Sequence, residues 1–254
     1  MFDAVATMPT HWVICGIIWA LTLGFAAGNY ACSLVHRLPR GRLILDKKPY
    51  CGNCGTLLQV KDLFPVFSAL LLRHRCRYCG VPFPVSHTWT EILVGLLFVL
   101  GFLKLGFTEY YILVLLIGVF LITLAAIHAN ENLIMGKVLL CVLFSGMLYR
   151  TLADHTIYNF FEGGLFALFA AAIIWFKNIK KEGHIYVLPQ AAQLLVVGGV
   201  CVGASQLMQF FALYGALFGL GIALGKIRGK PFPYTAAYGL AVTLTVLYPG
   251  IRLV

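Results

Sequence analysis

Long apolar stretches are the feature that most constrains how this chain can fold. They recur near residues 11–35, 89–106, 109–129, 133–152, 159–177, 187–204, 206–225 and 234–250. Most approach about 20 residues, the length that an α-helix needs to cross roughly 30 Å of hydrocarbon. With 61% hydrophobic and 11% charged residues, the chain has too little polar surface to cover a water-soluble globule. We predict an all-α polytopic membrane protein with about eight transmembrane helices.

Two parts of this pattern need interpretation. Gly198, Gly199, Gly203 and Ser205 interrupt one apolar run, so the run from 187 to 225 predicts two helices, with a single helix and a total of seven as the alternative. The stretch from Thr10 has neither a basic leader nor an evident cleavage site, and we expect it to be a retained first helix. A GxxxG pattern at 215–219 favours close helix packing.

The positive charge is concentrated between the first two predicted helices. Nine of the nineteen Lys and Arg residues lie between Arg37 and Arg77, and basic loops of membrane proteins stay in the cytoplasm. Smaller basic clusters at 177–181 and 226–230 fall on the same side if eight helices cross. The net charge of +10 is therefore explained by orientation and by contact with anionic membrane lipids, and it does not imply nucleic acid.

The same basic segment carries two Cys-x-x-Cys pairs. Cys51 and Cys54 form the first, Cys76 and Cys79 the second, and a glycine follows each pair. This spacing lets both thiolates of a pair turn onto one ion, and two pairs complete a tetrahedral four-sulfur site. We expect structural zinc, which would supply much of the folding energy of an insert with a thin core. The alternatives are two disulfides, disfavoured in the cytoplasm, and an iron cluster, for which nothing specific speaks.

The other cysteines lie singly in apolar stretches, where a free thiol behaves as a small hydrophobic group. We expect them to be packing residues, and they are Cys15, Cys32, Cys141 and Cys201.

The segments around the paired cysteines carry a family resemblance. They are residues 28–41 (GNYACSLVHRLPRG), residues 63–73 (LFPVFSALLLR) and residues 91–93 (EIL), and a final motif runs from Pro231 to Gly239. In order and spacing the chain resembles the bacterial type IV prepilin peptidases. That resemblance implies a bifunctional, multi-pass enzyme of the bacterial inner membrane, with the four-cysteine loop in the cytoplasm. Such enzymes cut leaders from prepilins and pseudopilins of type IV pilus and type II secretion systems, then methylate the new N-terminus with S-adenosylmethionine.

The resemblance also implies a domain organisation. Residues 1–36 correspond to the first transmembrane helix, residues 37–88 to a cytoplasmic metal-binding domain with four cysteine ligands, and residues 89–254 to a membrane domain that resembles the peptidase region.

The two aspartates of the family's protease site have no counterpart here. Peptide hydrolysis needs two paired carboxyl groups, one charged to activate water and one protonated to polarise the carbonyl. The first aspartate position aligns with His128 and the second with Tyr186, and no aspartate follows Asp154. We therefore expect an aspartic endopeptidase relative that is a pseudoenzyme for cleavage.

Two glutamates are the available replacements, and both are disfavoured. Glu131 and Glu182 lie near the two expected positions, but Glu131 stands almost one helical turn beyond His128, and Glu182 sits in a Lys-rich turn that explains it as an ion partner. A second metal site through His128 and His184 is equally disfavoured, because only the same two glutamates could complete it.

Three functional hypotheses remain. The first is a methyltransferase that binds S-adenosylmethionine and acts on prepilin N-termini. The second is a non-catalytic binding or assembly factor for prepilin-like membrane helices, and the third is proteolysis through His128, Glu131, Glu182 or Tyr186. Ionisable groups at membrane depth are sparse, which argues against a charge-coupled transporter.

Overall fold

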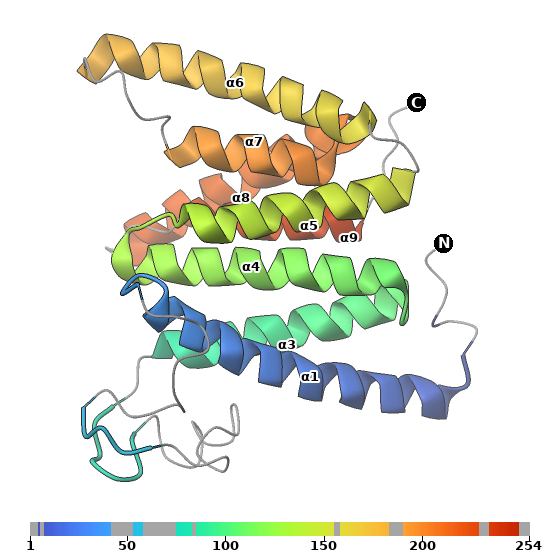
Figure 1. The fold of residues 1–254 in the computed structure, drawn as a ribbon, viewed down its shortest axis with the longest axis vertical. Helices are drawn as coiled ribbons and strands as arrows, with labels where there is room; N and C mark the ends of the chain where they lie inside the picture. The colour runs from blue at the N-terminus through green and yellow to red at the C-terminus, as the bar shows by residue number, and fades with distance from the viewer. Residues whose placement is uncertain are drawn as a thin grey trace. The chain divides into compact units, whose positions relative to one another are not determined.

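The protein folds into helices throughout the part of the chain that its computed structural model describes, which is residues 5, 8–41, 53–57, 75–82, 85–154, 158–182, 190–228 and 234–248. These residues contain eight α-helices, labelled as in Figure 1, and one short 3-10 helix, η2. Their bounds are α1 Thr10–Arg37, α3 Val85–Leu105, α4 Glu109–Glu131, α5 Gly136–Asp154, α6 Tyr158–Glu182, α7 Gln190–Val202, η2 Ala204–Gln206, α8 Leu207–Arg228 and α9 Tyr234–Leu247. The predicted all-α membrane fold is confirmed.

The helices differ in how well their length suits a membrane. Five segments are long and apolar enough to cross: Thr10–Arg37, His87–Leu105, Glu109–Glu131, Gly136–Asp154 and Ala204–Gly225. The apolar parts of α6, α7 and α9 are shorter, with α7 only 13 residues long. At 1.5 Å per residue α7 spans about 20 Å, less than a hydrocarbon core. Eight crossings therefore stay a prediction.

The apolar run from 187 to 225 is two helices, as predicted. Gly203 ends α7 with φ +73, and its N–H donates to the Gly199 carbonyl at 2.8 Å. Glycine reaches this left-handed conformation without the steric cost that a Cβ would add. The helical path restarts in η2 and continues as α8.

The chain divides into two compact units. The first comprises Met1–Tyr111 and Ile122–Leu133, and the second Ile112–Leu121 and Ile134–Val254. Helix α4 thus contributes residues to both.

In the first unit, α1 and α3 run side by side in opposite directions (Figure 1). Their close approach depends on small residues spaced four apart along α1, from Gly16 through Ala20 and Gly24 to Gly28, all of them buried. A Cβ added to Gly24 would lie 2.8 Å from the Cα of Gly95. Because the helices are antiparallel, the insert leaves α1 and re-enters α3 at the same end of the unit.

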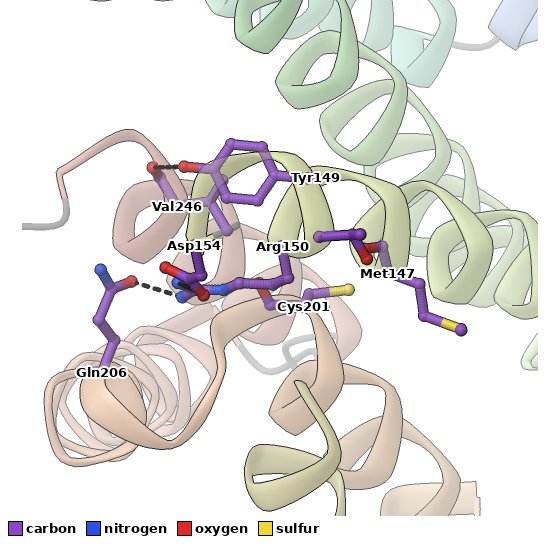
Figure 2. A network of polar contacts seen from close by, with 8 residues as sticks. Met147, Tyr149, Arg150, Asp154, Cys201, Gln206 and Val246 are labelled. Atoms are coloured by element: carbon purple, nitrogen blue, oxygen red, sulfur yellow. Dashed lines mark hydrogen bonds and ion pairs between the residues drawn. The ribbon is translucent and has the colours of Figure 1, made fainter. Parts of the chain in front are cut away.

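In the second unit, Arg150 of α5 joins several polar groups (Figure 2). Its Nε donates to the Cys201 carbonyl at 3.1 Å, its Nη2 to Gln206 Oε1 at 3.0 Å, and its Nη1 pairs with Asp154 Oδ2 at 3.4 Å. The residue is only 3% exposed. The sequence did not predict this role of the arginine. Arg150 holds the end of α7 and the end of η2 against α5.

Candidate metal centre and the altered aspartate positions

The second Cys pair and one member of the first come together in the structure. The Sγ atoms of Cys54, Cys76 and Cys79 all lie within 4.8 Å of one another. Cys51, the fourth predicted ligand, lies outside the described residues. Cys54 thus meets Cys76 and Cys79, which follow it by 22 or more residues. The paired spacing predicted this convergence on a shared ion.

Local backbone geometry explains how the thiols converge. Gly55 and Gly80, which follow the two pairs, have φ values of +68 and +71, a region that glycine enters readily. The Gly80 N–H donates to the Cys76 carbonyl at 2.9 Å, and the Cys76 N–H donates to the Val81 carbonyl at 2.9 Å. An isolated antiparallel bridge joins Arg75 to Pro82. The chain therefore doubles back immediately after Cys79 and holds the thiols of this pair on one side.

The donor set fits a soft or borderline cation. A tetrahedral zinc ion bound at about 2.3 Å holds its sulfurs about 3.8 Å apart, which is compatible with the observed cluster. Cys76 is buried at 3% exposure, while Cys54 is exposed. Asn53 Nδ2 donates to Cys79 Sγ at 3.7 Å, as expected where a neighbouring group tunes a metal-bound sulfur. Three mutually close sulfurs are also more than one disulfide accounts for. This cluster can hold a metal ion.

The first aspartate position lies near the end of α4. His128 is buried at 7% exposure in the last turns of that helix. Glu131, one turn later, is exposed and pairs with Arg40, with 3.5 Å between Nη2 and Oε1. Asn132 then ends the helix in a left-handed conformation, and its N–H donates to the His128 carbonyl at 3.0 Å. Glu131, the carboxylate closest to His128 in sequence, thus pairs with a cation at the surface.

The second position is less fully described. Glu182 is the last residue of α6, in the second unit. Tyr186 and His184 lie outside the described residues. The roles assigned to His128, Tyr186, Glu131 and Glu182 thus stay predictions.

One cluster was not predicted from the sequence. It lies where the insert of residues 37–88 joins α1 and α3. His36, in the last turn of α1, meets His87, near the start of α3, through their Nε2 atoms. Cys32, interpreted as a packing residue, also donates its thiol to the His87 carbonyl at 3.4 Å. A signal was available, because the two histidines flank an insert whose ends must meet if α1 and α3 are antiparallel.

Comparison with known proteins agrees with the resemblance found in the sequence. Residues 22–105 match the family described as Bacterial Peptidase A24 N-terminal domain. The chain is 30% identical over 126 residues to a prepilin leader peptidase/N-methyltransferase of Myxococcus xanthus, a match that covers 50% of this chain and 38% of that relative. Proteins of the same name match more fully. The one from Pseudomonas aeruginosa is 25% identical over 98% of this chain and 94% of its own length, and the one from Bacillus subtilis is 25% identical over 89% and 91%.

No solved structure matches the chain. The resemblance rests on sequence, on the apolar helices and on the cysteine cluster, which agree with one another. The chain is similar to the prepilin leader peptidase/N-methyltransferases, and its residues 22–105 match the bacterial peptidase A24 N-terminal domain.

Proposed function

We propose that this protein acts on type IV prepilins or pseudopilins at the bacterial inner membrane without cutting their leaders. Under this proposal the protein is part of a type IV pilus or type II secretion system. Residues 37–88 form a zinc-binding insert on the cytoplasmic face, after a first transmembrane helix at 1–36 and before a membrane domain at 89–254. The names of the proteins that it resembles, prepilin leader peptidase/N-methyltransferases, support the substrate class.

The observation that carries the loss of cleavage is the environment of the first aspartate position. His128 stands there, and an imidazole cannot share a proton with a second carboxyl group as an aspartyl dyad does. Glu131 does not replace the missing group, because its carboxylate is 41% exposed to solvent, whereas an aspartyl dyad depends on two carboxyl groups held against each other. With Tyr186 at the second position, the dyad has no carboxylate at either place.

Methyl transfer is the activity that we assign to the chain within this proposal. The methyl group would pass from the sulfonium of S-adenosylmethionine to the α-amino nitrogen of the substrate, which loses a proton. Because this chain leaves the leader in place, the free N-terminus must come from an active peptidase in the same cell. The alternative is a non-catalytic assembly factor that holds prepilin-like helices, and the loss of both aspartates favours this alternative.

Leader cleavage in proteoliposomes tests the first part. The unaltered chain is compared with a His128→Asp, Tyr186→Asp double variant on the same prepilin. We expect no cleavage by the unaltered chain. Cleavage would overturn the proposal, and Glu131→Gln and Glu182→Gln would then show whether those carboxylates form an unorthodox dyad.

Methylation is tested separately with a pilin whose leader has already been removed. S-adenosylmethionine carrying a labelled methyl group is added, and label on the N-terminal residue is measured by mass spectrometry. Label above a protein-free control supports the methyltransferase. If the protein binds pilin but neither transfers the label nor binds S-adenosylmethionine, the result supports the assembly factor. If it binds neither pilin nor S-adenosylmethionine, both the methyltransferase and the assembly factor are excluded.

A further inference from the structure

His36 and His87 present two nitrogen ligands to each other. Their Nε2 atoms are in contact, and the ring centroids lie 4.6 Å apart with an interplanar angle of 35°. Two imidazole lone pairs that face each other repel, so a proton or a metal ion must lie between them. Imidazole nitrogen is a common ligand of zinc, cobalt, nickel and copper.

The surrounding backbone fixes the position of both rings. His36 and His87 stand on different helices, and those helices pack closely where Gly28 meets the backbone of Glu91. The thiol of Cys32 donates to the His87 carbonyl at 3.4 Å, and Arg40 Nη1 donates to the His36 carbonyl at 2.7 Å. Both histidines are partly exposed, so an ion can reach them from solvent. The pair is therefore preorganised and accessible.

Arg40 links a carboxylate to the pair. Its Nη1 donates to the His36 carbonyl at 2.7 Å, and its Nη2 pairs with Glu131. Their ion pair is long, at 3.5 Å, and the two side chains are 41% and 52% exposed, so it contributes little to stability and can be exchanged. A cation between the rings would compete with Arg40 for the Glu131 carboxylate.

We propose that His36 and His87 form a binding site for a divalent transition metal, separate from the cysteine cluster, with water completing the shell and with Glu131 as a carboxylate that leaves Arg40 to reach the ion. Metal–nitrogen bonds of about 2.0–2.1 Å place the two nitrogens about 3.3 Å apart in a tetrahedral site, which a small rotation of each ring provides. Such an ion ties the end of α1 to the start of α3. The ion would therefore join the two ends of the insert.

Cobalt binding tests this site. The full chain is purified with a tag that contains no histidine, its cysteine cluster is loaded with zinc, and Co²⁺ is titrated in detergent. Bound cobalt is measured by elemental analysis and the ligand type by absorption. We expect one additional cobalt ion per chain, with d–d bands but without the thiolate-to-cobalt charge-transfer band that sulfur ligation produces. Glu131→Gln should weaken binding at least tenfold.

Matched variants decide the assignment. His36→Ala with His87→Ala should remove the additional cobalt, while His11→Ala, on the same helix α1 but far along it, should leave it unchanged. If the alanine variant unfolds, His36→Gln with His87→Gln preserves hydrogen bonding and removes the imidazoles. Equal binding by wild type and the paired variants, or a thiolate band, would overturn the proposal and leave the pair sharing a proton. Because this readout needs no prepilin, it stands or falls independently of the proposed function.

Discussion

The cysteine cluster and the Arg150 junction both gather polar groups where the chain departs from a helix, but they are completed differently. At the junction one cation meets a carboxylate, an amide oxygen and a backbone carbonyl (Figure 2). At the cluster the sulfurs of Cys54, Cys76 and Cys79 meet one another. Donors and acceptors that match need no further component, whereas converging cysteine sulfurs form a ligand set that suits a metal ion. A polar cluster is thus a candidate metal site when its members are ligands of one kind.

Loss of the cysteine ligands should have the largest effect. Cys76→Ser with Cys79→Ser removes two of the ligands, and metal binding contributes on the order of 10 kcal/mol to the folding of small metal domains. We expect the bound metal to be lost and the insert to become sensitive to protease. Elemental analysis and limited proteolysis measure both effects.

Cys15→Ser is the control for this change, because Cys15 is exposed on α1 and is not part of the cluster. It should retain metal and protease resistance. A thiolate-to-cobalt charge-transfer band in the Cys76, Cys79 double variant would contradict the assignment of the cluster and remove the contrast with the junction.

Removal of the Arg150 charge should act on stability alone. Arg150→Met leaves the Asp154 carboxylate without its partner. Because that side chain is 22% exposed, we expect the cost to fall below the roughly 3–5 kcal/mol of breaking a fully buried ion pair. Thermal unfolding in detergent should shift downward while metal content stays the same. Adding Asp154→Asn removes the orphaned charge and should recover part of the loss. A metal content that falls with Arg150→Met would show that the two regions are coupled rather than separate.

Gly203→Ala tests the same junction through its backbone. The residue has φ +73, and a Cβ there would lie 3.2 Å from Arg150 Nε. A non-glycine residue in the left-handed region costs about 1–2 kcal/mol, and the thermal midpoint should fall accordingly. Gly215→Ala is the matched control. No described atom lies within 4 Å of a Cβ at that position, so the higher helix propensity of alanine should leave the midpoint unchanged or raise it.

The sequence predicted those features that depend on local spacing. Apolar length located all eight described helices, and Gly203 was among the residues that predicted the break between α7 and α8. Contacts between distant residues were not predictable in this way. His36 meets His87 across 51 positions, and Arg150 meets Gln206 across 56. No described atom lies within 4 Å of a Cβ added at Gly215 or Gly219, so close packing at the GxxxG pattern stays a prediction, whereas Gly24 and Gly28 are among the glycines that make close approaches.

The smallest expected effect concerns the Arg40–Glu131 pair. It shares matched charges with the Arg150 junction, and it is exposed like parts of the cysteine cluster. Its members match, as at the Arg150 junction, but both are about half exposed, and such pairs contribute roughly 0–1 kcal/mol. A double-mutant cycle with Arg40→Ala and Glu131→Ala should give a coupling energy in that range, measured by thermal unfolding and reduced by added salt. A value well above about 1 kcal/mol would mean that Arg40 holds the carboxylate firmly. Glu131 would then be unable to turn toward a metal at His36 and His87. The Arg40–Glu131 pair would in that case be a self-sufficient polar cluster like the Arg150 junction, although it lies at the surface.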